Sequence, residues 1–305
     1  MKVFEKIVVA LQTTAEHPTN FGAYHLCCVA AVILITALMC IFLRKISEKS
    51  FRIIIGSLWL VMVLFEIYKQ IVFSYDANTG WDYNWSSFPY QLCSTPMYVL
   101  PILAFFKDGK IRDAAIFYIA TFSFFGGLVV YIFPNDVFNT DLLGIHIQTM
   151  VHHGIQVAIG IFAMVREREK LNFKYFLKGV LVYVGAIAIA LLLNAFVRPA
   201  VNEEFNMFYI NEIDNCALPL VGDVIKPNVP YIAFLLIYIV GFVGIALAIF
   251  YIEYAIIKGI ARYIRRKGMY TYEKQREDEK PRVYSYQKQK EKEKPRTYSY
   301  QKDKK

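Results

Sequence analysis

Seven long apolar stretches make up most of the chain and leave it very few possible folds. They run roughly over residues 21–43, 51–73, 88–106, 111–133, 145–165, 175–196 and 229–251. A helix needs about 20 mostly apolar residues to cross the hydrocarbon core of a bilayer, and each stretch is about that long. The stretches are continuous rather than alternating, which excludes the strands of a membrane barrel. The sequence therefore predicts an all-α polytopic bundle of seven transmembrane helices.

The Lys and Arg residues are concentrated in alternate loops. The loops after the first, third and fifth stretches, together with the C-terminal tail, hold 29 of them, whereas the N-terminal segment and the other loops hold 4. In membrane proteins the excess of Lys and Arg marks the cytoplasmic loops. We therefore predict a multi-pass protein of the plasma (cytoplasmic) membrane, with its N-terminus outside and its C-terminus in the cytoplasm.

The composition divides the chain into three parts. Residues 1–20 are predicted to form an extracellular segment with an interfacial helix over Val3–Gln12, and residues 21–257 form the transmembrane domain. The tail, residues 258–305, holds 17 Lys and Arg against 7 Asp and Glu, so the positive net charge of the chain lies there. The rest of the chain is close to neutral.

The tail contains a repeat, because Glu279–Lys288 recurs almost unchanged as Glu293–Lys302. It has almost no aliphatic residues and cannot bury a core, so we predict that it is disordered. A basic cluster just past the last stretch would meet anionic headgroups of the membrane. Nucleic-acid binding is not expected. The cluster comprises Arg262, Arg265, Arg266 and Lys267.

Polar side chains inside the stretches fall at one depth. With a rise of about 1.5 Å per residue, Glu66 lies roughly 10 Å below the outer end of its helix and Cys93 roughly 8 Å below the end of the next. His152 and His153 lie roughly 10–12 Å deep in the fifth helix. Such groups are costly in a bilayer and usually face a cavity or a partner. We therefore predict one outward-facing polar pocket, with Lys69, Gln91, His146 and His152 as residues that contact a substrate.

A thiol beside an imidazole is the minimal equipment for nucleophilic catalysis. We expect Cys93 to be the nucleophile, His153 or His152 the general base, and Glu66 the residue that orients the ring. The alternatives are structural: Cys93 as a small buried hydrophobe, the histidines in interhelical hydrogen bonds, and Glu66 paired with Lys69.

A metal site is the weaker interpretation of the same residues. His146 and His153 stand two turns apart, roughly 10 Å, which is too far to bind one metal ion together. We therefore predict no metal. No soluble cofactor is implied either, because an acyl ester supplies its own activation.

Four motifs occur in order around these residues. They are the acidic end of the second stretch at Glu66, an aromatic loop leading into Phe88-Pro-Tyr-Gln-Leu-Cys93, His146 followed by His153-Gly154, and Leu218–Asp223 with Pro230-Tyr231. Over roughly residues 20–255 this pattern resembles the YwaF-like family of integral membrane proteins, which includes a eukaryotic transmembrane acyltransferase. The resemblance implies a seven-helix fold and a cysteine-dependent transacylase acting on phospholipids. It maps the nucleophile to Cys93 and the histidine to His153, while Gln91 stands where the family usually has His.

Three functions follow from the sequence. The first is a lipid acyltransferase or lipid hydrolase, for which membrane lipids are both environment and substrate. The second is a small transporter or ligand-binding module that uses the same pocket, with Glu66 and a histidine coupled to protons. The first and last three stretches show no internal repeat of the kind common in transporters. The third is a structural or sensory protein whose tail carries the function.

Overall fold

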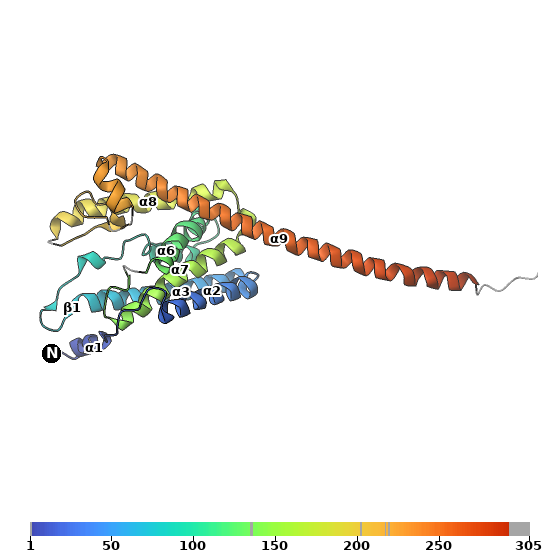
Figure 1. The fold of residues 1–305 in the computed structure, drawn as a ribbon, viewed down its shortest axis with the longest axis horizontal. Helices are drawn as coiled ribbons and strands as arrows, with labels where there is room; N and C mark the ends of the chain where they lie inside the picture. The colour runs from blue at the N-terminus through green and yellow to red at the C-terminus, as the bar shows by residue number, and fades with distance from the viewer. Residues whose placement is uncertain (1, 135–136, 202, 217, 219, 293–305) are drawn as a thin grey trace, which may run out of the picture. The chain divides into compact units, whose positions relative to one another are not determined.

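The computed structural model describes residues 2–134, 137–201, 203–216, 218 and 220–292, with side chains up to residue 267. Most of the structure is helical, and a short antiparallel hairpin with two residues in each strand follows α3 (Figure 1). The elements are α1 (Val3–Leu11), α2 (Ala23–Leu38), η1 (Met39–Leu43), α3 (Glu48–Phe73), β1 (Tyr75–Asp76), β2 (Gly80–Trp81), η2 (Trp85–Ser87), α4 (Pro96–Phe105), α5 (Lys110–Tyr118), η3 (Ile119–Ser123), α6 (Phe124–Ile132), α7 (Leu143–Arg166), η5 (Arg168–Lys170), α8 (Phe173–Val197), η6 (Arg198–Ala200), η7 (Met207–Tyr209), η8 (Val221–Ile225), η9 (Lys226–Asn228) and α9 (Tyr231–Lys292).

Among the described residues, six helices are long and apolar enough to cross a membrane. This confirms an all-α polytopic membrane protein, while the count of seven and the orientation stay predictions. The six segments are Ala23–Leu43, Glu48–Phe73, Lys110–Ile132, Leu143–Arg166, Phe173–Ala200 and Tyr231–Lys267.

The stretch at 88–106 is not the continuous helix that we predicted. Its helix, α4, has only 10 residues, about 15 Å, which is half the thickness of a hydrocarbon core. Pro96 stands at the start of α4, where its missing N–H costs nothing, whereas inside a continuous helix it would remove a hydrogen bond. Pro89 disfavours helical backbone in the residue before it, and Phe88 accordingly has a ψ of 131°. Residues 88–95 therefore form turns, and Cys93 lies just before a helix instead of inside one.

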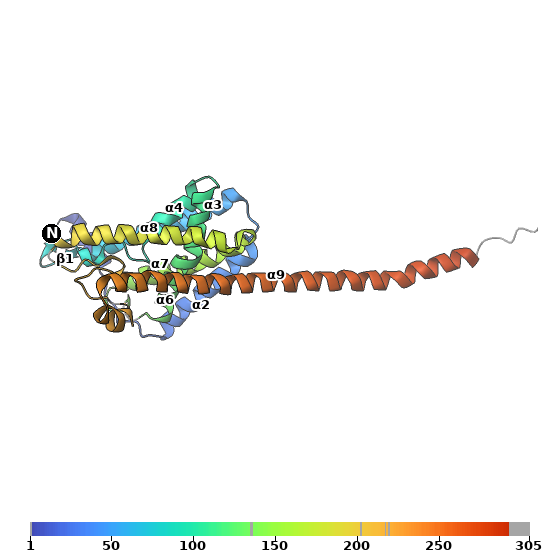
Figure 2. The ribbon, with the colours of Figure 1, turned by 90° about the horizontal axis from the view of Figure 1, so that it is seen from above.

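Helix α7 lies at the centre of the bundle. It contacts α2, α3, α5 and α6, and most of its residues are buried. In both views α6 and α7 lie between α8 and α2 (Figure 1, Figure 2). A Cβ on Gly127 would lie 2.7 Å from the carbonyl oxygen of His153 and 2.9 Å from Cβ of Gln156. Glycine is therefore required where α6 presses against the histidine-bearing face of α7.

A charge network around Glu48 ties three helices together at one end of the bundle. Arg52 of the same helix binds Oε1 of Glu48 at 2.9 Å, and Arg112 of α5 binds that oxygen at 2.6 Å. Arg166 of α7 binds Oε2 at 3.0 Å. The guanidinium groups of Arg112 and Arg166 also lie over the ring of Phe51. The network fixes the relative positions of α3, α5 and α7 at this end.

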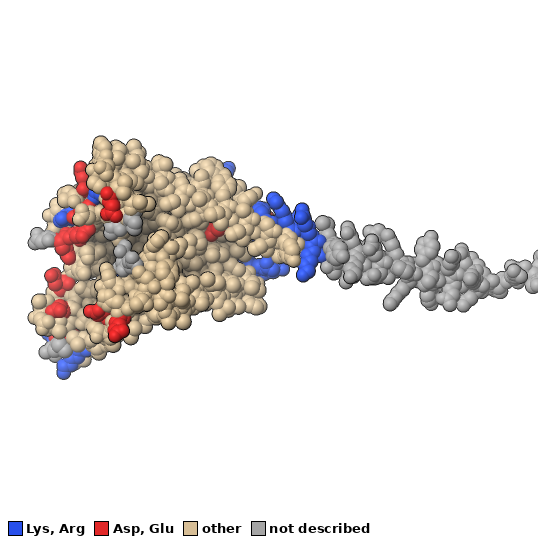
Figure 3. All heavy atoms as spheres, viewed as in Figure 1, with Lys and Arg blue, Asp and Glu red and all other residues tan. Residues whose placement is uncertain are grey.

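The opposite end carries α1 and the β1–β2 hairpin, and most of the Asp and Glu side chains visible on the bundle gather there (Figure 3). The helix predicted over residues 3–12 is present as α1. Gln12, at its end, donates to the carbonyl oxygens of Val72 at 2.9 Å and Tyr75 at 2.6 Å. These bonds dock α1 onto the end of α3.

Residues 203–216, between α8 and α9, fold inward. Phe205, Met207, Phe208 and Ile210 are each at most 1% exposed. Asn194 of α8 exchanges two hydrogen bonds with the backbone of Met207, at 2.7 and 3.0 Å. The hydroxyl of Tyr238 donates to the carbonyl oxygen of Phe208 at 2.7 Å. The segment is thus fastened to α8 on one side and to the start of α9 on the other.

By its contacts the chain forms two units, Met1–Tyr254 and Ala255–Lys305. Helix α9 continues to Lys292, beyond the start of the tail at residue 258, and the disorder of the tail stays a prediction. A lack of aliphatic residues excludes a core but not a single helix. Extension costs little once a helix has been nucleated, and Lys, Glu, Gln and Arg are good helix formers. The second copy of the repeat, 293–302, lies outside the described residues.

Candidate functional site

A cavity of about 330 Å³ lies among α3, the turns at 88–95, α6 and α7, with residues from the inward-folded segment and α9 completing its wall. It brings together six of the seven residues singled out in the sequence. These six are Glu66, Lys69, Gln91, Cys93, His152 and His153. Polar groups on three different segments of the chain thus meet in one space, which is what their common depth indicated.

His146 is the exception, because it does not belong to the cavity wall. It shares a face of α7 with His153 but stands two turns away, and it is 1% exposed. Its Nε2 lies 2.5 Å from the carbonyl oxygen of Thr140, and its ring packs edge-on against Phe138. These two contacts hold the imidazole in place, and through them it fixes the connection between α6 and α7. The prediction that His146 contacts a substrate is therefore not supported by its position.

The other two histidines each donate one ring N–H to a carbonyl oxygen. Nε2 of His152 lies 3.0 Å from the carbonyl oxygen of Cys93, and Nδ1 of His153 lies 2.8 Å from that of Thr149. A carbonyl can only accept, so these bonds fix the tautomers. In the neutral rings the lone pairs then sit on Nδ1 of His152 and Nε2 of His153. Both atoms are buried without a hydrogen-bond partner among the described residues.

The backbone of Cys93 is held by α7. Its carbonyl oxygen accepts from His152 and, at 2.8 Å, from Nε2 of Gln156. A Cβ on Gly126 would lie 3.5 Å from Cα of Cys93, so α6 also packs closely against this turn. The Cys93 side chain is partly exposed. Within the described residues, the histidine bond to residue 93 ends on the carbonyl oxygen and not on the thiol.

Cys93 lies two residues before Thr95, the N-cap of α4. The N-terminal end of a helix carries partial positive charge from its unpaired N–H groups and favours an anion there. This is one of the environments in which thiolates form in proteins. The turn that interrupts the predicted helix therefore places the thiol close to the N-terminal end of α4.

The partners of Glu66 lie on its own helix. Its Oε1 is bound by Lys69 at 2.8 Å and by Nε2 of Gln70 at 2.7 Å. Both partners stand one turn away on α3, so the carboxylate is neutralised by its own helix. The structural alternative, an ion pair of Glu66 with Lys69, is the one that the structure contains. The carbonyl oxygen of Thr149 is the group that orients the ring of His153.

Gln91 links the turn to the inward-folded segment. Its Nε2 donates to the carbonyl oxygen of Asn206 at 2.8 Å, while its Oε1 is buried without a partner among the described residues. Asn206, Gln70 and Gln156 all support the cavity and were not among the predicted site residues. Gln156 could have been found, because it is a polar residue at the same depth of an apolar helix. Asn206 gives no such signal, because it lies in a loop.

No group of three or more His, Cys, Asp or Glu residues capable of holding a metal ion occurs in the part of the chain that the structure describes. The cavity wall carries a thiol, two imidazoles and one carboxylate–ammonium pair, besides several hydroxyl groups.

The model of the TMEM164 family matches residues 17–254, which include the bundle and every candidate residue. The chain belongs to the TMEM164 family. Membership of this transmembrane family agrees with the apolar helices and makes the chain a multi-pass membrane protein. The match to the TMEM164 model ends at the residue where the first structural unit ends, so the tail lies outside it. No curated protein and no solved structure matches the chain significantly.

Proposed function

We propose that this TMEM164-family protein transfers acyl groups from membrane phospholipids, with Cys93 as the nucleophile. One observation carries the proposal: a partly exposed thiol just before α4 shares a cavity with two imidazoles, each with one ring nitrogen that has no hydrogen-bond partner among the described residues. The resemblance of the motifs around Cys93 and His153 to the YwaF-like family, with its eukaryotic acyltransferase, supports the same chemistry.

The reaction uses His153 as the general base. Its Nε2 takes the thiol proton, and the sulfur attacks the carbonyl carbon of the lipid ester. The bond between that carbon and the leaving oxygen breaks, and His153 returns the proton to the leaving alcohol, a lysolipid. A thioester on Cys93 remains. A second alcohol, or water, attacks this thioester with its proton passing to His153, which releases the acyl product and restores the thiol.

The other residues of the wall have supporting parts. His152 is a positioning residue, because its ring holds the carbonyl oxygen of Cys93 in place. Lys69 is near enough to influence both Cys93 and His153 electrostatically, so its ammonium favours the negative charge that develops during attack. Gln91 offers its buried amide oxygen to a polar group of the substrate.

The membrane setting of the proposal follows from the charge pattern. The cavity would open toward the outer side of the plasma membrane, with the tail in the cytoplasm. The cluster Arg262, Arg265, Arg266 and Lys267 would then lie at the anionic headgroups of the inner leaflet.

The rival function is a proton-coupled transporter that binds a solute in the same cavity. The ion pair of Glu66 with Lys69 counts against it, because protonation of that carboxylate would have to break a 2.8 Å contact inside the bundle. We therefore favour acyl transfer over transport.

The test is to trap the thioester. The purified protein in nanodiscs is incubated with phospholipid carrying a labelled acyl chain, quenched in acid, digested and analysed by mass spectrometry. We expect an acyl adduct on the peptide that contains Cys93, removable by neutral hydroxylamine and absent from Cys93→Ser.

Cys40→Ser is the matched control, because Cys40 is also partly exposed but lies outside the cavity. It should leave the adduct in place. Label that persists in Cys93→Ser would overturn the assignment of the nucleophile. Absence of any adduct, together with proton-driven solute uptake that Glu66→Gln abolishes, would favour the transporter instead.

A further inference from the structure

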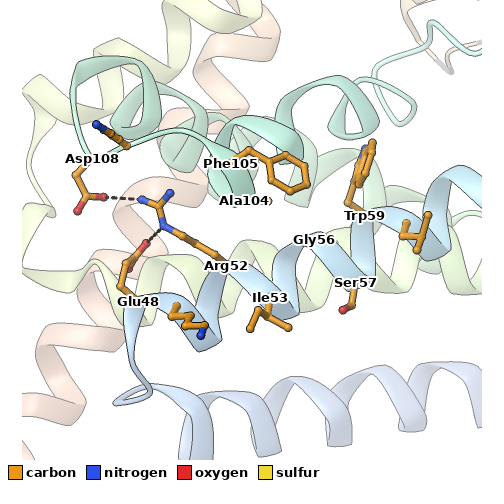
Figure 4. A pocket seen from close by; sticks show the side chains of 12 residues that line it. Glu48, Arg52, Ile53, Gly56, Ser57, Trp59, Ala104, Phe105 and Asp108 are labelled. Carbon is orange, nitrogen blue, oxygen red and sulfur yellow. Dashed lines mark hydrogen bonds and ion pairs between the residues drawn. The ribbon is translucent and has the colours of Figure 1, made fainter.

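A second hollow lies near the other end of α3, where that helix meets α4 (Figure 4). It is an open groove of about 830 Å³. Its apolar wall is formed by Ile53, Gly56, Trp59 and Leu60 of α3 and by Ala104 and Phe105 of α4. None of its lining residues belongs to the cavity that holds Cys93. The groove is thus a separate feature of the bundle.

The groove exists because a glycine and a tryptophan set its shape. A Cβ on Gly56 would lie 3.7 Å from Cβ of Ala104, an ordinary contact, so the absent side chain leaves usable space instead of relieving a clash. The indole of Trp59 donates to the carbonyl oxygen of Met97 at 2.8 Å, which fixes its ring between the two helices. Both helices are apolar, so the groove can accommodate a lipid chain.

Charged residues surround the end of the groove beside the Glu48 network. Arg52 is already satisfied, with Glu48 at 2.9 Å, Asp108 at 3.6 Å and the carbonyl oxygen of Phe106 at 2.5 Å, and Figure 4 shows the first two contacts. Lys49 and Lys107 are exposed and form no ion pair with any described residue. The carboxylates of Glu48 and Asp108 are thus paired with guanidinium groups, while the ammonium groups of Lys49 and Lys107 have no ion-pair partner among the described residues.

We propose that this groove binds an anionic phospholipid. Its phosphate would lie between Lys49 and Lys107, and one acyl chain would run along Gly56 and Trp59. The apolar wall is matched to a lipid chain, and the two unpaired ammonium groups are matched to a headgroup of net negative charge. Arg52 and Glu66 stand 14 residues apart on α3, roughly 21 Å along the helix, so this lipid is not the substrate of the reaction proposed at Cys93.

The chain offers its own reporter for this site. Trp59 is one of three tryptophans, and Trp81→Phe with Trp85→Phe leaves it as the only one. In nanodiscs, its fluorescence is quenched by lipids with brominated chains that occupy the groove. We compare brominated phosphatidylglycerol with brominated phosphatidylcholine, each in an equimolar mixture with the other, unbrominated lipid. We expect phosphatidylglycerol to quench preferentially.

The lysines are tested by Lys49→Gln combined with Lys107→Gln. A basic side chain near anionic headgroups gives about a fivefold gain in affinity, so loss of both lowers the relative affinity for phosphatidylglycerol about thirtyfold. Lys45→Gln combined with Lys174→Gln is the matched control, because these lysines, in the turn before α3 and in the first turn of α8, are exposed and do not line the groove. It should leave the preference unchanged.

The wall is tested by Gly56→Leu, which fills the groove without displacing backbone. It should reduce quenching by both lipids, whereas Gly185→Leu, at an open position of α8, should not. Equal quenching by the two lipids in the starting protein would overturn the anionic selectivity. A preference that survives the loss of both lysines, or quenching that Gly56→Leu leaves intact, would overturn the assignment of the site.

Discussion

The two ends of α3 treat their polar groups in opposite ways. At one end, Glu48 is bound by three guanidinium groups from α3, α5 and α7. At the other, Glu66 is neutralised on its own helix, while nitrogens of His152 and His153 and the amide oxygen of Gln91 are buried without partners among the described residues. Both ends carry a buried or half-buried glutamate, but Glu48 is paired across three helices and Glu66 only within α3.

This contrast separates structural polar groups from those available to a ligand. A buried donor or acceptor that lacks a partner costs about 1–3 kcal/mol. Several such atoms on one cavity wall lower the stability of the fold, and packing alone does not explain why they are there. A bound substrate or water would satisfy them. We therefore expect substitutions at the cavity to change activity at nearly constant stability, and substitutions at the Glu48 network to do the reverse.

The largest effect is expected at His153. His153→Asn keeps a donor at the position of Nδ1 for the carbonyl oxygen of Thr149 and removes only Nε2. We expect the rate of thioester formation to fall about a thousandfold, equivalent to about 4 kcal/mol, with an unchanged melting temperature. The rate is measured by quench-flow with labelled phospholipid.

His152→Gln is the companion variant, because it retains a donor at the position of Nε2 for the carbonyl oxygen of Cys93. It should slow the reaction less than about tenfold, as expected for a residue that only positions the backbone. If His152→Gln slowed thioester formation more than His153→Asn, His152 would be the general base and His153 the positioning residue.

The next effect is expected at the charged end. Arg112→Met removes a guanidinium that is 3% exposed and leaves Glu48 with one partner fewer. Since Glu48 is 37% exposed, the loss is smaller than for a fully buried pair, about 2 kcal/mol in the free energy of unfolding. Unfolding in detergent measures it. Arg168→Met removes an exposed pair and should change stability by less than about 0.5 kcal/mol. Equal effects of the two substitutions would contradict the importance of the network.

The smallest effect is expected where α9 fastens the inward-folded segment over the cavity. Tyr238→Phe removes a buried 2.7 Å hydrogen bond and leaves the carbonyl oxygen of Phe208 unsatisfied. We expect a loss of about 1 kcal/mol, seen as faster amide hydrogen exchange in residues 203–216 and not in α7. Tyr251→Phe, at a side chain that is 51% exposed, is the control. Unchanged exchange in Tyr238→Phe would show that this bond does not hold the segment.

The sequence was sufficient for the positions of the helices and for the meeting of Glu66, Cys93 and the two adjacent histidines. Length and apolarity define the spans, and depth then follows from the rise of a helix. The same reasoning placed Cys93 inside a helix, because it gave Pro89 and Pro96 too little weight as breaks. It also counted His146 among the pocket residues, although the same rise sets it two turns from His153, and the cavity wall does not include it.

A single sequence does not show which distant residues form hydrogen bonds with each other. The bonds that hold Cys93 come from residues 59 and 63 positions away, and Arg112 reaches Glu48 across 64 positions. No local pattern encodes such pairings. The burial of the segment around Phe208 was hidden for a related reason, because its anchors Asn194 and Tyr238 lie on two different helices.

The short α4 has a consequence for water. Backbone at membrane depth that is not helical needs hydrogen-bond partners, and lipid chains supply none. A cavity of about 330 Å³ has room for on the order of ten water molecules, at about 30 Å³ each, beside the turns that precede α4. The interrupted helix thus leaves room for water next to Cys93. In the reaction that we propose, the amount of this water that an incoming alcohol displaces would set the ratio of acyl transfer to hydrolysis.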